Sequence, residues 1–514
     1  LGQPRPEISA AAAAAAQAAA AATTASTTLM NVGACVPSGK GKDYQVGPLA
    51  GQYASLDLVP WQSLAAGDTV RIFNDTTKTT ASVYKGKFLL TGVGTATAPI
   101  RICGVKTADG KRPIIDAKDA VSKRGLAYGN ILHETRSIIV VKPLQTQAWE
   151  YVPKYIQIDG LDLQGANPSN KFTDSLGTVR AYEKFGACIW VDRGQNITIA
   201  DNLIHDCTNG IFTKSAPDGD FAVTKDIRLA GNYIYGNGNA YSESEHNTYV
   251  QSVNVVYEFN RFGPLRANAG GNLLKDRSAG TVVRYNRFEE GAHALDLVDA
   301  TDFAEQAKAL PSYRKTYVYG NVIIKNGNTG TLIHYGGDMA GGEANFRKGT
   351  LYFFNNTVYA TGSGAVQMFQ LSTTDERAEV WNNILAWAPS VQYASLRAKQ
   401  DLDPACIDSK GAACQSGGIL NFGKNWINAN WADSDPYHVV TGQVTGQANL
   451  IKGATLPVDL ATMIPLAGSA VIDASTANLS AVSTYTVSNQ ISSTFQALVR
   501  NVNGAAADLG AMER

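Results

Sequence analysis

The sequence has no excess of charge of either sign. Its 514 residues include 44 Lys and Arg and 44 Asp and Glu, so the formal net charge is zero. A balanced chain lacks the continuous basic surface that binds DNA, RNA or an anionic membrane. There is also no apolar run of about 18 residues, the length that spans a bilayer. The nearest candidate, Ala10–Ala22, is almost pure alanine. We therefore expect a soluble protein with neither a nucleic-acid partner nor a membrane insertion.

Several motifs that mark common enzyme classes are absent. The chain has no nucleophile elbow, P-loop, dinucleotide fingerprint or HExxH motif. No two cysteines have the CxxC spacing of a zinc ribbon or a thioredoxin-type site. Neither the 12-residue calcium loop nor the glycine-rich calcium nonapeptide occurs. These absences argue against the enzyme and metal-site classes that such motifs define.

Six cysteines are present, and this number favours an oxidising compartment. Cys406 and Cys414 enclose a short polar loop, a spacing that favours a local disulfide. The other plausible pairs are Cys35 with Cys103 and Cys188 with Cys207. The chain starts at Leu1 without a basic segment followed by an apolar one, so we infer that a secretion signal has been removed. We expect a secreted or periplasmic protein.

The most informative feature that is present is an internal repeat. Seven segments share an extended apolar-alternating stretch, an Asn and a second short apolar stretch, as in ITIADNLIHDC and VVRYNRFEEG. The shared residues are Asn202, Asn232, Asn260, Asn286, Asn321, Asn356 and Asn383. Successive copies are 26 to 35 residues apart. An eighth copy, IQIDGLDLQG, places Gly160 at the Asn position, since Gly and Asn both tolerate a left-handed bend.

A second set of short strands lies between these copies, including NGIFTKS, HNTYVQS, NLLKDRS and HALDLVD. These strands alternate with a period of two and are bounded by Gly and Asn. A repeat of this length, with two or three strands and no helical periodicity, is typical of one coil of a parallel β-solenoid. A β-sandwich would need hairpin turns, and propeller blades would be longer. We predict an all-β solenoid in which the Asn side chains stack at one turn and hydrogen-bond along the stack.

The two ends differ from the repeats in composition. Residues 1–30 are rich in Ala and Thr, and we predict a lead or linker. We assign 31–388 to the solenoid. Residues 389–450 lack the Asn pattern and are interpreted as an insertion or a cap, and 451–514 as the final coil and C-terminal closure.

Three features together resemble known proteins. The segment GTATAPIRICG, the Asn-punctuated coils and the final DLGAMER resemble secreted right-handed parallel β-helix proteins, most of which act on polysaccharides. The segment GGNLLKDRSAGTVVRYNRFEEGAHALDLVD is similar to the catalytic coil of the chondroitinase B and alginate lyase family. This resemblance implies a right-handed parallel β-helix, and it places Lys275 where that family has its catalytic base. The family's Arg-His-Gly motif is replaced here by Leu297, Val298 and Asp299.

Charge is segregated around this match. From Arg261 to Arg287 there are six basic residues and one acid, whereas from Phe288 to Glu305 there are six acids and no Lys or Arg. In a solenoid these stretches form neighbouring coils, about 4.8 Å apart. Many of the residues would then form ordinary surface ion pairs. Strand alternation, however, places Lys275 and Arg277 on one face, where both would be available to a ligand.

The chemistry that suits this set is β-elimination of a uronic-acid-containing glycan. A cation must hold the carboxylate and the enolate-like intermediate, a base must remove the C5 proton, and an acid must protonate the leaving oxygen. We assign Lys275 as the base, expecting that the like charge of Arg277 lowers its pKa. Arg277 would hold the carboxylate. The candidate acids are His246, Tyr249 and His293. The predicted substrate-binding residues are Arg266, Arg284, His334 and Tyr335.

Two further hypotheses use the same region. A calcium ion would suit the oxygen ligands of Glu243, Glu245, Asp296 and Asp299. A glycoside hydrolase would use two of these carboxylates as acid and base, although Asp296 and Asp299, three apart on a strand, would face opposite sides. A non-catalytic glycan-binding β-helix is the third alternative. The predicted partner is an anionic polysaccharide.

Overall fold

The computed structural model describes most of the chain. The described residues are 33–290, 293–325, 331–338, 342–398, 402–407, 413–434 and 440–514, without the side chains of 397–417 and 435–443. The predicted lead at 1–30 lies outside them. None of the helices in these ranges combines the length and the apolar character needed to cross a bilayer.

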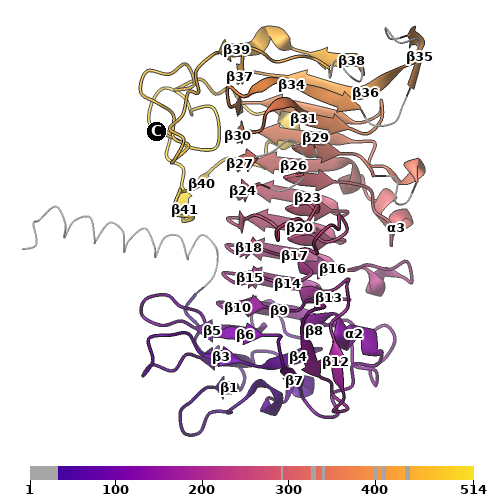
Figure 1. Cartoon of the computed structure of the whole chain (residues 1–514), viewed down its shortest axis with the longest axis vertical. Helices are drawn as coiled ribbons and strands as arrows, with labels where there is room; N and C mark the ends of the chain where they lie inside the picture. Colours follow the sequence, from indigo (N-terminus) through magenta and orange to yellow (C-terminus); the bar gives the residue numbers. More distant parts are fainter. Residues whose placement is uncertain are drawn as a thin grey trace, which may run out of the picture.

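Three long parallel sheets run along the molecule (Figure 1). The first sheet contains β1 (Asp43–Val46), β2 (Thr69–Phe73), β5 (Ile100–Val105), β9 (Lys154–Asp159), β14 (Gln195–Ala200), β17 (Lys225–Ala230), β20 (Val253–Glu258), β23 (Ala279–Arg284), β26 (Lys315–Tyr319), β29 (Thr350–Phe354), β32 (Arg377–Trp381), β36 (Ala413–Phe422), β35 (Leu402–Ile407) and β38 (Val440–Thr445). The second contains β3 (Val83–Tyr84), β6 (Ile114–Asp116), β10 (Asp162–Gln164), β15 (Leu203–His205), β18 (Tyr233–Tyr235), β21 (Arg261–Phe262), β24 (Arg287–Glu289), β27 (Val322–Lys325), β30 (Thr357–Ala360), β33 (Ile384–Trp387), β37 (Asn425–Asn428) and β39 (Leu450–Gly453).

The third sheet contains β12 (Val179–Ala181), β11 (Lys171–Thr173), β7 (Ala120–Ser122), β4 (Gly86–Leu90), β8 (Ser137–Val141), β13 (Ala187–Val191), β16 (Asn209–Thr213), β19 (Thr248–Val250), β22 (Leu274–Asp276), β25 (Leu295–Leu297), β28 (Ile333–Tyr335), β31 (Gly364–Leu371) and β34 (Val391–Ala398). Two short helices, α2 (Ile131–Thr135) and α3 (Ala304–Lys308), lie in connecting loops. Each full coil adds one strand to each sheet in parallel register, so the predicted right-handed parallel β-helix is confirmed.

The predicted Asn ladder is present and is one residue longer than expected. The side-chain amide of Asn202 donates to Asn232 Oδ1 at 3.1 Å, and the same bond repeats up the stack until Asn383 donates to Asn425 Oδ1. The ladder asparagines are almost completely buried. Because each Oδ1 also accepts a backbone N–H, as from Asn202 to Asn232, the ladder satisfies polar groups that the turn would otherwise leave unpaired.

The assignment of Gly160 to the Asn position is wrong by one residue. Leu161 donates its N–H to Asn202 Oδ1 at 3.0 Å and therefore occupies that position. Gly160 instead aligns with Asp201, and both have a positive φ, of 70° and 56°. The left-handed residue is thus the one before the ladder Asn, which itself has no positive φ.

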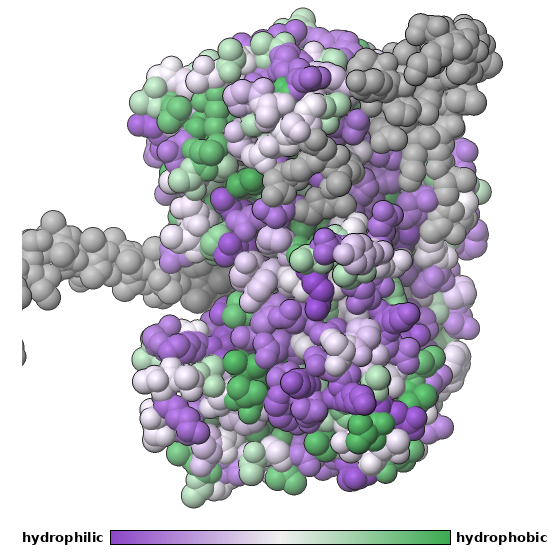
Figure 2. Space-filling model, in the orientation of Figure 1, coloured by the Kyte–Doolittle hydropathy of each residue, from purple (hydrophilic) through white to green (hydrophobic). Residues whose placement is uncertain are grey.

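Inward-facing side chains form aliphatic and aromatic files that fill the coil interior. One file on the first sheet contains Ile102, Ile158, Ile199, Leu229, Tyr257, Val283, Val318 and Phe353. Each of these is essentially inaccessible to water. Burial of such a side chain contributes about 1.5–3 kcal/mol, which explains why the apolar period of the sequence determines the register. The outer surface seen in Figure 2 is mostly polar, with small separate apolar patches.

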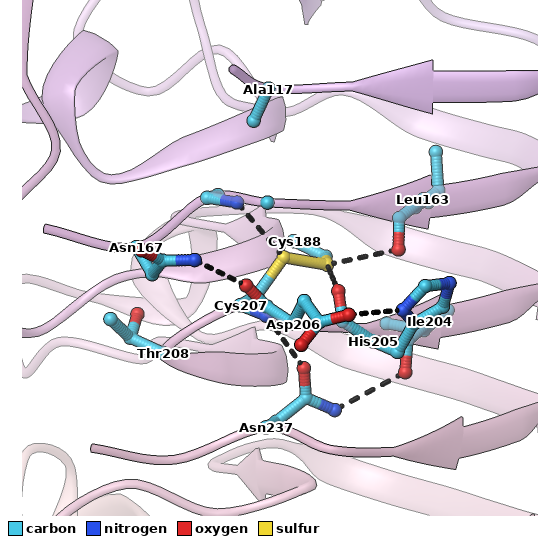
Figure 3. Close-up of a disulfide and its surroundings, with 12 residues drawn as sticks. Ala117, Leu163, Asn167, Cys188, Ile204, His205, Asp206, Cys207, Thr208 and Asn237 are labelled. Carbon is cyan, nitrogen blue, oxygen red and sulfur yellow. Dashed lines mark hydrogen bonds and ion pairs between the residues drawn. A yellow bond between two sulfur atoms is a disulfide. The ribbon is translucent and has the colours of Figure 1, made fainter. Parts of the chain in front are cut away.

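Two of the predicted disulfides are confirmed, Cys35–Cys103 and Cys188–Cys207. The second lies in the interior and joins β13 to the turn that follows β15 (Figure 3). Cys207 is held further by the side chain of Asn237, which accepts its backbone N–H at 3.0 Å. The bridge therefore closes a single coil. The predicted Cys406–Cys414 pair lies among side chains outside the described set.

The sheets continue past residue 388. In the segment 389–450, strands β34, β36 and β37 pair in parallel with the preceding coil, while β35 pairs antiparallel with β36. After β39 the chain runs back along the outside of the solenoid (Figure 1). Gly510 donates its N–H to the carbonyl of Asn382 at 2.8 Å, and the Tyr285 hydroxyl donates to Thr486 at 3.0 Å. The tail carries one hairpin, β40 (Asn489–Ile491) with β41 (Ala497–Val499).

Candidate active site

A file of side chains on the third sheet contains most of the predicted site. Parallel register aligns Lys275 on β22 with Asp296 on β25 and His334 on β28. Toward the N-terminus the same file continues through Tyr249 on β19. The neighbours of Lys275 within its strand, Leu274 and Asp276, are inaccessible and face the interior. This file lies on strands, whereas Arg277, Asp299 and Asp338 follow the ends of β22, β25 and β28.

Lys275 and Arg277 converge on one carboxylate. Lys275 Nζ lies 2.8 Å and Arg277 Nη2 lies 2.5 Å from the same oxygen, Oδ2 of Asp338. The prediction that the two cations share a face is therefore confirmed. Asp338 follows β28, more than sixty residues away in sequence, and no pattern in the sequence singled it out. The expectation that both are available to a ligand is wrong, because Lys275 and Arg277 are almost fully buried and are paired with carboxylates of the protein.

Asp296 is surrounded by hydrogen-bond donors. Its Oδ2 accepts from Lys275 Nζ at 2.5 Å and from Asn272 Nδ2 at 2.8 Å, and its Oδ1 lies 2.8 Å from His334 Nδ1. Burial alone would raise the pKa of Asp296, but Lys275 and His334 outweigh it and hold the pKa well below its usual range. Asp296 is therefore a carboxylate at every physiological pH.

The expectation that Lys275 has a lowered pKa is wrong. Burial and the charge of Arg277 do favour the neutral amine, but the carboxylates of Asp296 and Asp338 outweigh them and raise the pKa. Lys275 is therefore protonated at neutral pH in the free protein. The sequence argument considered the neighbour in the strand and had no means of seeing partners from other coils.

Asp299 also faces this cluster, contrary to the expected opposite orientation. Its backbone oxygen accepts from Arg277 Nη1 at 2.7 Å, and its Oδ1 accepts the N–H of Asp338 at 2.9 Å. Strand β25 ends at Leu297, so the alternation on which the expectation rested stops before Asp299. Burial raises the pKa of Asp299, against the opposing effects of Arg277 and the Asp338 N–H.

Strand β22 is supported from the coil interior by a buried ion pair. Asp276 is fully buried and accepts from Arg347 Nη2 at 3.1 Å, Tyr257 Oη at 2.9 Å and Thr281 Oγ1 at 2.6 Å. Arg347 is itself inaccessible and also donates to the backbone oxygen of Ser278 at 2.8 Å. The inward carboxylate of Asp276, next to Arg277 in the sequence, is thus fully partnered, as a buried charge must be.

Of the three candidate acids, the two histidines are neutral. His246 Nδ1 accepts the N–H of Asn272 at 2.8 Å, and burial together with Lys275 keeps its pKa well below the usual value. Burial likewise lowers the pKa of His293 to about 4. Tyr249 differs because its hydroxyl oxygen accepts Nε–H of Arg277 at 2.9 Å. Of the three candidates, Tyr249 is thus the one whose side chain is hydrogen-bonded to Arg277.

The predicted substrate-binding residues do not assemble at one place. Tyr335 is part of the inaccessible core. Arg284 lies on the first sheet, where its Nε donates to Glu258 at 2.8 Å. Arg266 lies in the loop after β21 and donates to the carbonyl of Gly238 at 2.9 Å. His334 alone is in the cluster, against Asp296. The prediction of Arg266, Arg284 and Tyr335 as substrate-binding residues is therefore not supported by their positions.

The predicted calcium ligands also do not form one set. Glu243 is exposed, and Glu245 is buried with no hydrogen-bond partner for its Oε2. Asp296 and Asp299 are already occupied by Lys275 and Arg277. In the part of the chain that the structure describes, the one group of three His, Cys, Asp or Glu with converging ligand atoms is His293, Asp296 and His334.

Comparison with known proteins gives similarity at the level of solved structures. No family model and no curated protein sequence matches the chain. An alginate lyase from Paenibacillus sp. str. FPU-7 is 15% identical over 75% of this chain and 95% of that chain, with a TM-score of 0.30. Pectate lyase Pel9A is 12% identical over 93% and 98%, with a TM-score of 0.39. A GH136 lacto-N-biosidase from Eubacterium ramulus is 11% identical over 80% and 68%, with a TM-score of 0.33. At these identities and TM-scores the similarity concerns the fold alone.

Proposed function

We propose that this protein is a polysaccharide lyase that cleaves a uronic-acid-containing glycan by β-elimination. The observation that carries the proposal is the convergence of Lys275 and Arg277 on one carboxylate oxygen of Asp338. A uronate carboxylate is chemically equivalent to the Asp338 side chain and would replace it between the two cations. Charge-assisted hydrogen bonds of this kind are about twice as strong as neutral ones.

The same pair supports the elimination chemistry. Removal of the C5 proton places negative charge on the uronate carboxylate, and preorganised cations stabilise that charge in the transition state. We assign this role to Lys275 and Arg277 together, because Lys275 is protonated in the free protein. Tyr249 acts in its phenolate form, which the Nε–H of Arg277 stabilises by a hydrogen bond to the phenolate oxygen, and this oxygen takes the proton from C5. The hydroxyl formed in this way then donates its proton to the leaving glycosidic oxygen.

Calcium has no part in this proposed reaction. The oxygen ligands suggested by the sequence are separated or are bonded to Lys275 and Arg277, so they do not provide the all-oxygen shell that Ca²⁺ prefers. We propose that the protein is a secreted or periplasmic enzyme and that it acts on an anionic polysaccharide. Two disulfides support it, because such bonds persist mainly in oxidising compartments.

A hydrolase is the second candidate, and one observation favours it. The pKa of Asp296 is lowered while that of Asp299 is raised, and carboxylates whose pKa values diverge can act as base and acid. A panel of polyuronates separates the two functions. Ultraviolet absorbance from unsaturated ends is expected for the lyase. New reducing ends without that absorbance would establish the hydrolase, and neither signal, with binding retained, would establish the glycan-binding alternative.

A further inference from the structure

The cluster beside Lys275 contains three metal-type ligands that the proposed reaction does not use. His293, Asp296 and His334 come from two adjacent coils, and their ligand atoms all lie within 4.8 Å of one another. Asp296 and His334 are aligned by parallel register, and both are almost fully buried. His293 lies just before β25. Two imidazoles and a carboxylate are the donor set of many transition-metal sites.

Hydrogen bonds orient His334 toward such an ion. Its Nε2 lies 3.1 Å from Ser372 Oγ, and that hydroxyl donates to the carbonyl of Gly337 at 2.8 Å. Ser372 thus holds Nε2 in place. Because Asp296 is a carboxylate and can only accept, His334 Nδ1–H donates to its Oδ1 in the metal-free protein, and an ion would displace this proton and take Nδ1 as its ligand. A second partner that fixes the tautomer of a histidine is the usual support of a metal ligand.

The other two ligands are held in the same manner. His293 Nδ1 lies within hydrogen-bond distance of the backbone of Thr331, which leaves Nε2 for an ion. Asn272 accepts the backbone N–H of His293 at 3.3 Å and donates to Asp296 Oδ2 at 2.8 Å. One asparagine thus positions both residues, and Asp296 Oδ1 is left on the side of the histidines.

We propose that His293, Asp296 and His334 bind a divalent transition-metal ion, such as Zn²⁺, next to the carboxylate-binding pair. Nitrogen ligands favour Zn²⁺ or Co²⁺ over Ca²⁺, which prefers an all-oxygen shell. The ion would replace the contact between His334 Nδ1 and Asp296 Oδ1. This inference is independent of the lyase proposal.

The positive charge of Lys275 affects the affinity of the proposed metal site. Its ammonium lies 2.5 Å from Asp296 Oδ2, on the opposite oxygen to the one that would bind the ion. Two cations on one carboxylate repel each other, so Lys275 must weaken metal binding. Lys275→Met keeps the bulk of the side chain and removes this charge. It should therefore strengthen binding.

The experiment is a Co²⁺ titration of the full chain, followed by visible absorption and without any polysaccharide. We expect a saturable band with one ion per chain that added Zn²⁺ displaces. His334→Ala and His293→Ala should each weaken binding about tenfold or more. His334→Gln serves as a second variant because it retains polar contacts if the alanine variant unfolds. Lys275→Met should bind more tightly than the wild type.

The matched control is His133→Gln, which removes a half-exposed histidine that faces Asp192 at 3.5 Å. It should bind Co²⁺ as the wild type does, and circular dichroism should show that each variant is folded. Absence of a saturable band in the wild type would overturn the site, as would equal binding by folded His334 and His133 variants. Since no glycan is present, these outcomes are independent of whether the protein proves to be a lyase.

Discussion

Two lysines buried on the third sheet show how differently one fold treats the same side chain. Lys87 on β4 is enclosed by the rings of Phe172 and Tyr182, at 4.2 and 4.6 Å, and burial lowers its pKa to about 7 despite Glu134. Lys275 on β22 is buried to a similar extent, but two carboxylates raise its pKa. The lysine whose pKa is nearest neutrality is thus the one in the apolar interior. A shifted pKa identifies a functional group only where partners and access agree with it.

On the third sheet, an aromatic cluster lies between Lys87 and the charged residues around Lys275. Trp190 and Phe212 stack at 4.0 Å, and Tyr249 contacts Phe212 edge-on at 5.1 Å. The next residue of the same file is Lys275. Tyr249 therefore belongs to both regions, because aromatic packing holds its ring while Arg277 holds its hydroxyl. An uninterrupted register can place an apolar and an ionic environment side by side.

The largest effect is expected at this boundary. Tyr249→Phe keeps the ring and its aromatic contacts but removes the group that transfers the proton. Activity on the best polyuronate should fall by about 10²–10⁴-fold, with only a small change in the thermal midpoint. The rate of ultraviolet absorbance increase is the measurement. Phe212→Leu, which alters packing without touching the hydroxyl, is the control, and equal losses in both variants would argue against a role for the hydroxyl.

The second prediction separates the two roles considered for Lys275. Lys275→Ala should lower turnover by about 10²–10³-fold because one of two carboxylate-binding cations is lost. Lys275→Arg retains the charge and should recover part of the activity if the side chain holds the carboxylate. If Lys275 is the base that the sequence predicted, the arginine variant should be as inactive as the alanine variant. Lys87→Met should retain full activity, since that lysine lies away from the site.

The third prediction concerns stability beneath the site. Arg347→Met leaves the buried carboxylate of Asp276 without its cation, and such a loss typically costs about 3–5 kcal/mol. Urea unfolding followed by circular dichroism should show this as a lower midpoint. Arg228→Met is the control, because the half-buried Arg228 pairs with Glu258, which keeps Arg284 as a partner. A similar shift in both variants would contradict the conclusion that the buried Arg347–Asp276 pair contributes more to stability than the half-buried pair of Arg228.

The smallest effect is the pH dependence of Lys87. Its folded pKa of about 7 lies below the unfolded value of about 10.4. Between these values the unfolded chain binds more protons, so stability contributed by this group rises with pH from about 7 to 10. Lys87→Met should remove that rise. Comparing urea midpoints of wild type and variant at pH 7 and 9.5 tests this, and parallel changes in both proteins would show that Lys87 is not the source.

Much of the architecture could be predicted because it depends on local, repeated patterns. Period-two apolar alternation determines which side chains enter the coil interior, and a recurring Asn can satisfy the same turn in every coil. The incorrect alignment of Gly160 with the ladder Asn also came from reliance on a local pattern. Gly tolerates the left-handed bend, but the bend lies one residue before the ladder, a distinction that needs the backbone angles of Asp201.

For the site, the sequence by itself determined that Lys275 and Arg277 share a face, because strand alternation depends only on neighbours in the chain. Only the tertiary structure decided their charge state and their partners. Asp338 is separated from Lys275 by 63 residues and Arg347 from Asp276 by 71, so the coils that bring them together had to form first. Electrostatic effects depend on distance in space rather than along the chain, which is why the pKa of Lys275 rises although its nearest charged neighbour on the same face of the strand is an arginine.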